Sequence, residues 1–170
     1  SVPKATRQYT ALVLTFEKPI DEGYSFSVSY VLSRNYGNYP GLYNPDNEQI
    51  SPNASTIFDF PDMYANSTGL LPNDVTHMLK LSGSYAFTFG LTAGAAFFLQ
   101  SGTPINDFAG SAEGSAWLTF LQPRGTAGRM PMLWDLNLRL TYDVAQLVGW
   151  PVHPRLIVDV LHLASQKKAT

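Results

Sequence analysis

The stretch YSFSVSYVLS, residues 24–33, places an aromatic or aliphatic residue at every second position and serine at most of the positions between. Successive side chains of a β-strand point to opposite faces of a sheet, so this pattern predicts a strand with one apolar face and one small polar face. Residues 12–17 show the same alternation, and PIDEG at residues 19–23 supplies turn-forming residues between the two segments. Residues 12–33 are therefore predicted to form a β-hairpin.

The two-residue period recurs in residues 78–87, 91–100 and 134–142, and less regularly in residues 155–163. Each segment is about 9–11 residues long, which is enough for a tilted strand to cross the hydrocarbon core of a membrane. Helical spacing fits none of the first five segments. The sequence thus predicts an all-β fold, an antiparallel up-and-down meander of about six strands.

The connections between these segments alternate in length. Residues 19–23, 88–90 and 143–154 are short or moderate links, whereas the links at about 35–76 and 101–133 are long and rich in Gly, Pro, Asn and Ser. Compact soluble domains seldom contain structureless loops longer than about 12–15 residues. Outer-membrane barrels do, because they combine short periplasmic turns with long extracellular loops. The order of links therefore predicts part of a transmembrane β-barrel; a two-layer sandwich, with the same apolar faces against a protein core, is the alternative.

The composition agrees with strands that face lipid. Of 170 residues, 45% are hydrophobic and 14% are charged, against roughly 25% charged residues in an ordinary globular domain. No apolar run approaches the roughly 20 residues that a membrane-spanning helix needs. Alternating strands would place the apolar half of the chain on the lipid side, and aromatic residues near the segment ends would lie at the headgroup level.

Several functional classes are excluded or disfavoured. A net charge of −2 gives no electrostatic footprint for nucleic acid. The absence of cysteine excludes disulfides, thiolate metal sites and a cysteine nucleophile. None of the common nucleotide-binding, hydrolase or metalloprotease motifs occurs. We therefore expect no enzymatic activity, no cofactor and no metal.

Short stretches spread along the chain resemble a known family. They are RNYGNYPGLYN at residues 34–44, IFDFPD at 57–62, GLLPND at 69–74, QSGTP at 100–104 and PRGTAGR at 123–129. Together and in this order they resemble TonB-dependent outer-membrane receptors of the Oar-like group, over most of the chain from Arg7 to Lys168. DVLHLAS at residues 159–165 looks like a degenerate form of the family's late strand motif, with His162 and Ser165 in place of asparagines.

The resemblance implies a location and a role. Such receptors carry a carboxypeptidase-regulatory-like domain, a plug domain and a barrel of about 22 strands, so residues 1–170 are expected to form a C-terminal portion of the barrel without the plug and N-terminal domains. The smallest closed barrels need about eight strands, which this chain would reach only if the long loops hide two more, for example around residues 115–121. The implied function is ligand uptake across the outer membrane. The implied partners are outer-membrane lipid, the remaining strands and plug, the TonB system and an unidentified extracellular ligand.

A soluble all-β binding or adhesion module, with residues 35–76 and 101–133 as two recognition loops, is the alternative function. In either case the loops hold the candidate ligand-binding residues. Exposed tyrosines suit recognition of sugars or peptides, although they also pack loops together. The acidic residues of the first loop do not follow the spacing of a calcium loop, and the arginines of the second loop are expected to pair with them or with lipid phosphates. The candidates are Tyr36, Tyr39, Tyr43, Asp59, Asp62, Arg124 and Arg129.

Overall fold

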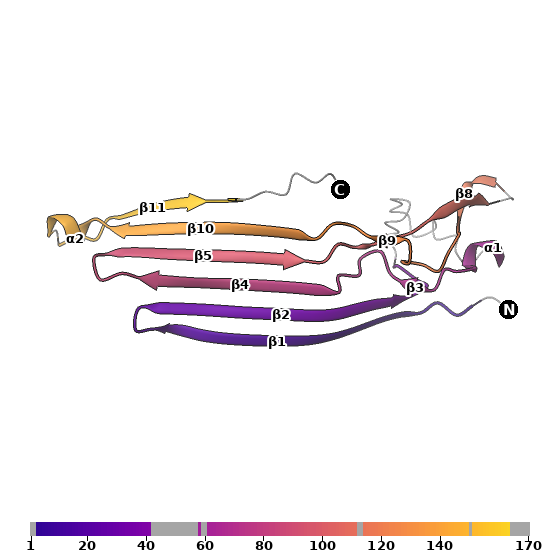
Figure 1. The fold of residues 1–170 in the computed structure, drawn as a ribbon, viewed down its shortest axis with the longest axis horizontal. Coiled ribbons are helices and arrows are strands. Elements are labelled where there is room, and N and C mark those ends of the chain that lie inside the picture. Colours follow the sequence, from indigo (N-terminus) through magenta and orange to yellow (C-terminus); the bar gives the residue numbers. More distant parts are fainter. Residues whose placement is uncertain (1–2, 42–57, 59–60, 112–113, 150, 164–170) are drawn as a thin grey trace.

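The computed structural model describes residues 3–41, 58, 61–111, 114–149 and 151–163. Within them, six strands form one antiparallel sheet in a meander order, and a short seventh strand pairs with the second (Figure 1). In spatial order the six are β1 (Arg7–Asp21), β2 (Tyr24–Gly37), β4 (His77–Ala86), β5 (Leu91–Gln100), β10 (Leu133–Asp143) and β11 (Arg155–Val160); the seventh is β3 (Gly69–Leu70). The predicted all-β antiparallel meander is confirmed.

The first hairpin is longer than the hydrophobic pattern indicated. β1 has 15 residues and β2 has 14, where about 9–11 were expected. The pairing runs from Arg7, opposite Gly37, to Asp21, opposite Tyr24. Backbone hydrogen bonding continues past the point where the side-chain alternation ends, because a ladder needs only peptide groups. Glu22 and Gly23 form the turn with φ of 50° and 83°, as a type I′ hairpin turn requires.

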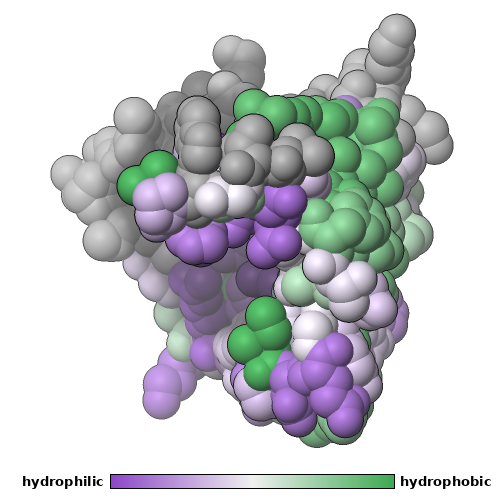
Figure 2. Space-filling model, turned by 90° about the vertical axis from the view of Figure 1, so that its left-hand side faces the viewer, coloured by the Kyte–Doolittle hydropathy of each residue, from purple (hydrophilic) through white to green (hydrophobic). Residues whose placement is uncertain are grey.

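The register gives the sheet two chemically different faces. Leu81 of β4 lies opposite Phe97 of β5, which lies opposite Leu136 of β10. We call the side of these residues the apolar face. On the other side, the polar face, Ser82 lies opposite Ala96, and Ala96 opposite Asn137. Figure 2 shows a hollow lined by hydrophilic residues, with hydrophobic residues gathered along one outer side.

Little of this hydrophobic surface is buried. Among the described residues the buried hydrophobic side chains are Met63, Leu71, Phe120 and Ala145, all in connecting segments, whereas Leu14, Phe16 and Leu140 in the sheet remain exposed. A sandwich would cover such residues with a second layer. The structure describes no such layer over this sheet.

The long connections contain small elements of their own. They include α1 (Pro61–Tyr64), β6 (Pro104–Ile105), β7 (Phe108–Ser111), β8 (Gly114–Phe120) and β9 (Gly128–Arg129). β6 pairs with β9 and β7 with β8, separately from the main sheet. A strand, β8, is therefore present in the region suggested for barrel closure, but it does not join the main sheet. In the described part of the chain the sheet stays open, with β1 and β11 as its edges.

The last hairpin contains the second helix, α2 (Ala145–Val148), and ends in an irregularity. Neither helix described is long and apolar enough to cross a membrane. β11 ends at Val160, which lies opposite Leu138, and the N–H of Leu163 donates to the carbonyl of Leu136 at 2.9 Å. One extra residue has thus entered the strand, as in a β-bulge. His162 provides it with φ of 52°, a conformation in which Asn and His are enriched.

Candidate functional site

The two long connections meet in a polar cluster at the loop-side ends of β2 and β4, which we call the loop clasp. Four of its members are buried and the fifth, Arg129, is exposed; the buried members are Asn35, Ser67, Asp74 and Arg124. Asp74 is 0% exposed and Arg124 is 1% exposed. Charged side chains are almost never this buried unless they are paired, so their contacts decide what the cluster does.

Asp74 is the acceptor at the centre of the clasp. The turn that holds it begins at Leu71, whose carbonyl accepts from the N–H of Asp74 at 2.8 Å. The carboxylate of Asp74 accepts from the backbone N–H of Asn35 at 2.6 Å, from Oγ1 of Thr76 at 3.0 Å and from Nη2 of Arg129 at 2.6 Å. These three donors, one of them charged, compensate for the removal of the carboxylate from water.

Arg129 connects the second loop to the first. Its Nη1 donates to the carbonyl of Gly102 at 2.9 Å, while its Nη2 forms the ion pair with Asp74. The expected pairing between the arginines of the second loop and the acids of the first loop is therefore present for Arg129. Glycine is required at 102 for close approach, since a Cβ there would overlap the carbonyl of Met130.

Arg124 fastens a second point between the same loops. Its Nε donates to the carbonyl of Ser67 at 2.8 Å, and its guanidinium lies 4.4 Å from the ring centre of Phe120. Its backbone N–H donates to the carbonyl of Asn66 at 2.9 Å. A Cβ at Gly69 would overlap the carbonyl of Arg124. Charged and backbone contacts thus join the two loops into one unit.

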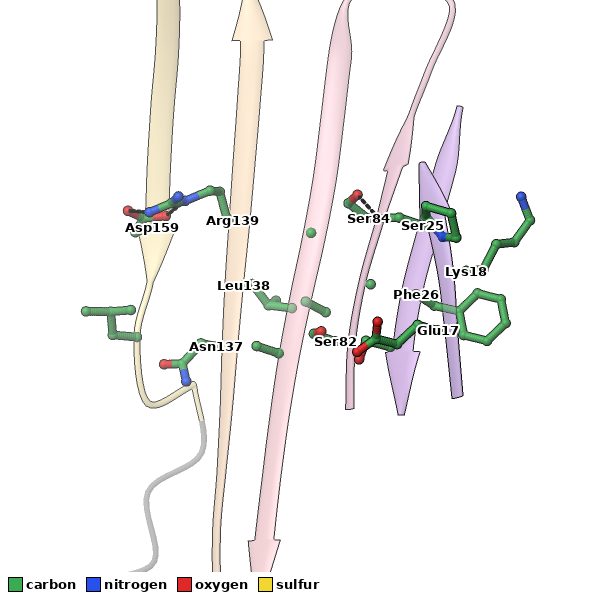
Figure 3. A pocket seen from close by; sticks show the side chains of 17 residues that line it. Glu17, Lys18, Ser25, Phe26, Ser82, Ser84, Asn137, Leu138, Arg139 and Asp159 are labelled. Carbon is green, nitrogen blue, oxygen red and sulfur yellow. Dashed lines mark hydrogen bonds and ion pairs between the residues drawn. The ribbon is translucent and has the colours of Figure 1, made fainter. Parts of the chain in front are cut away.

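A groove of about 860 Å³ on the polar face is the second candidate site. Small residues form its floor, where the hydroxyls of Ser25 and Ser84 are 2.8 Å apart. Glu17 stands on one side, and on the other Arg139 donates to both carboxylate oxygens of Asp159, at 2.6 and 2.8 Å (Figure 3). The groove offers hydroxyls and a closed ion pair, which suits a wetted or hydrogen-bonding surface.

Beyond this groove, β10 and β11 are joined by further polar contacts. Nδ1 of His162 lies 2.7 Å from Asp135, the amide of Asn137 donates to Asp135 at 2.7 Å, and the backbone N–H of His162 donates to Asn137 at 3.1 Å. Asp135, Asn137 and Arg139 occupy alternate positions of β10, so these contacts and the Arg139–Asp159 pair lie on the same face. They keep β11 in register up to the bulge.

Those predicted ligand-binding residues that the structure describes lie in different places. Arg124 and Arg129 lie together in the loop clasp. Tyr36 lies in β2 on the apolar face, with the guanidinium of Arg34 4.3 Å from its ring centre. Tyr39 is half-buried, and its N–H donates to the carbonyl of Thr6 at 3.1 Å.

Of the remaining predicted residues, Asp62 falls within the described part of the chain. Asp62 lies in α1, whereas Tyr43 and Asp59 lie outside the described residues. Sequence reasoning missed Asn35 and Ser67 as members of the clasp and treated Asp74 only as one acid among several. The signal for Asp74 was its position directly after Pro-Asn in a turn.

The contacts at these sites hold loops and strands together. In the clasp, Arg129 pairs with Asp74 and Arg124 donates to the carbonyl of Ser67. Among the described residues, no group of three or more His, Asp or Glu side chains is placed to hold a metal ion. The clasp can fix the shape of the loops, and the groove can contact water or a polar partner.

One comparison with known proteins finds a relative. The TonB-dependent transporter Oar of Myxococcus xanthus is 34% identical over 155 residues, which are 85% of this chain and 14% of the relative. This chain therefore spans a small part of the relative's length. No protein-family model matches the chain, and no solved structure matches it significantly.

Proposed function

Because this chain is homologous to the TonB-dependent transporter Oar, we propose that it forms part of the wall of a transmembrane β-barrel in the outer membrane. Residues 1–170 would be a C-terminal portion of that barrel, with the two long connections as extracellular loops. The parent protein would take up a ligand across the outer membrane with its plug and the TonB system. No enzymatic activity is part of the proposal, since the relative is a transporter.

The observation that carries the proposal is that aromatic and basic side chains form two lines across the apolar face, one near each end of the strands. We call these side chains the markers. At the loop end of this face the markers are Arg34 on β2, His77 on β4 and Trp134 on β10. At the turn end they are Phe26, Tyr85 and Tyr142, eight positions away on each strand. Apart from Gly83, only hydrophobic residues lie between the markers on that face. Interfacial aromatic and basic residues bound the apolar band of membrane proteins in this way.

The two lines of markers run obliquely to the strands. Leu32, not Arg34, lies opposite His77, and Leu79 lies opposite Leu99, which lies opposite Trp134. Each line therefore shifts by two residues from β2 to β4 and by two more from β4 to β10. The total shift of four residues is about 14 Å along the strands, and the three strand spacings from β2 to β10 are together about 14 Å across the sheet. If the two lines follow the membrane surfaces, the strands are inclined at about 43° to the membrane normal, within the roughly 35–45° of membrane barrels.

The spacing between the two lines also fits a membrane. Eight residues of strand at this tilt correspond to a height of about 20 Å between marker backbones, close to the roughly 25 Å apolar band of outer-membrane barrels. Lys18 lies opposite Phe26 at the turn end, and its Nζ is 4.0 Å from the ring centre of Tyr24. A cation over an aromatic ring at each boundary is consistent with headgroup contact.

The polar face supports the same orientation. Glu17, Asp135 and Asp159 lie on the polar face, as do Lys80 and Arg139. In a barrel this face lines the lumen, where charged side chains are solvated or contact the plug. The open edges at β1 and β11 would be closed by the remaining strands, because unpaired backbone groups in lipid cost several kcal/mol each.

Cell fractionation of the parent protein tests this proposal. We expect the full-length protein to sediment with outer membranes, to resist extraction by alkaline carbonate, and to be released by detergent. The soluble binding or adhesion module makes the opposite prediction. Recovery of the parent as a soluble monomer without detergent would contradict the membrane proposal and favour that alternative.

A further inference from the structure

Arg34 is an exposed cation on the apolar face. It lies in β2 at the loop-end boundary, and its guanidinium is stacked 4.3 Å from the ring centre of Tyr36. Arg129 and Arg139 both form ion pairs, but within the described ranges Arg34 has no ion-pair partner. Its charge is therefore available to an anion from outside this part of the chain.

Among the described residues, the register neighbours of Arg34 on that face include no acid. Thr10 lies directly opposite Arg34 in the register, and Gln8 lies opposite Tyr36. Leu32 is the next residue of β2 on the same face. The side chains nearest to Arg34 along this face are therefore a hydroxyl, an amide, an aromatic ring and a leucine, which favour an anionic ligand with an apolar part.

An apolar groove of about 570 Å³ lies next to Arg34. Three leucines from β1, β2 and β3 contribute to it: Leu12, Leu32 and Leu70. Thr10 and Arg34 also line the groove. Arg129 lines it as well, but its guanidinium is already paired with the carboxylate of Asp74. A cation beside leucine side chains matches an amphiphile that has a charged head and an aliphatic tail.

We propose that Arg34, Thr10 and the leucines of this groove bind a membrane lipid with an anionic phosphate headgroup. The phosphate accepts hydrogen bonds from the guanidinium, whose fork fits two phosphate oxygens. Tyr36 holds the guanidinium plane, and an acyl chain lies along Leu12 and Leu32. This inference rests on the proposed function, since it places the apolar face in a bilayer.

Native mass spectrometry of the full-length parent in neutral detergent tests the lipid site. Phosphatidylglycerol is titrated, with zwitterionic phosphatidylcholine as the comparison lipid. We expect Arg34→Gln to weaken the apparent affinity for phosphatidylglycerol about fivefold, the usual contribution of one basic residue near an anionic lipid surface. Arg34→Lys keeps the charge but loses the two-pronged donor, and its affinity is expected to lie between those of Arg34→Gln and the unmodified protein, which separates loss of charge from misfolding.

Lys80→Gln is the matched control. Lys80 is exposed like Arg34, but it lies on the polar face, opposite Ser29 and Phe98, so its removal is expected to leave phosphatidylglycerol binding unchanged. Equal affinities of Arg34→Gln and the unmodified protein would overturn the site. Glycerol phosphate has the headgroup but no acyl chain. If it displaced phosphatidylglycerol when present at the same concentration, the groove would have no role in binding.

Failure of the lipid site can be distinguished from failure of the proposed function. A parent protein that fractionates with outer membranes, yet binds phosphatidylglycerol equally well with Arg34→Gln, contradicts the lipid site alone. A parent protein that is soluble without detergent contradicts the proposed function itself, and the lipid site with it.

Discussion

Replacing Asp74 with alanine is expected to open the loop clasp. The substitution removes the acceptor of Arg129 Nη2, Thr76 Oγ1 and the Asn35 N–H. The Arg129 side chain is 30% exposed and can be solvated when its partner is lost, so the main cost is that of a buried donor left without an acceptor, about 1–3 kcal/mol. Arg124 is 1% exposed, so trypsin can cleave after it only when the clasp opens. If opening and closing are fast, the cleavage rate follows the population of the open form, and it is expected to rise between about tenfold and a hundredfold.

Timed digestion of the full-length protein with trypsin, followed by mass spectrometry of the fragments, measures this rate. Asp107→Ala is the matched control, because Asp107 is an exposed acid of the second loop whose carboxylate contacts only Gln122 among the described residues. Exposed pairs contribute little to stability, so this variant should be cleaved at nearly the original rate. Unchanged cleavage after Arg124 in the Asp74→Ala protein would show that the clasp does not hold the loops together.

A charge at Ala95 is expected to destabilise the protein far more than a charge at the next residue. Ala95 and Ala96 are consecutive, exposed alanines in β5. Ala95 lies on the apolar face opposite Leu138 and Gly83, and Ala96 on the polar face opposite Asn137 and Ser82. An arginine on the lipid side near the bilayer centre costs about 2–4 kcal/mol, whereas lumen positions tolerate charge. Ala95→Arg should therefore lower the free energy of unfolding by about this amount, and Ala96→Arg much less.

Urea unfolding of the parent protein in lipid vesicles gives both free energies under the same conditions. In a soluble module with this sheet exposed to water, both substitutions would be surface changes, usually within about 0.5 kcal/mol of neutral. Equal small effects of Ala95→Arg and Ala96→Arg would therefore contradict a lipid-facing apolar face. Comparing Ala95→Arg with Ala96→Arg is informative because both positions are exposed alanines on the same strand and differ in the face on which they lie.

The sheet was predictable because its signal is local. Alternation such as Phe26-Ser27-Val28 is read directly from neighbouring residues, and the positions of the turns then fix the order of the strands. The extension of β2 to Gly37 was not predictable in this way. Arg34 and Asn35 break the apolar–serine pattern, yet their backbone groups continue the ladder with β1. Tyr36 was assigned to a loop for this reason.

The loop clasp was predictable only in part. The charge difference between the loops pointed to Arg124 and Arg129 as partners of the first loop. Nothing in the sequence says that Arg129 selects Asp74, or that Nε of Arg124 donates to the carbonyl of Ser67. Such contacts join positions 55 and 57 residues apart, and they depend on how both loops fold over the ends of the strands.

The accessibility of Ala95 and Ala96 to lipid tests the central claim most directly. The chain has no cysteine, so Ala95→Cys and Ala96→Cys each introduce a single labelling position within it. A fluorophore attached at either position in the parent protein is measured in vesicles whose lipids carry bromine on the acyl chains, which quench on contact. A lipid-facing apolar face predicts strong quenching at position 95 and weak quenching at position 96; equal quenching at the two positions would contradict it.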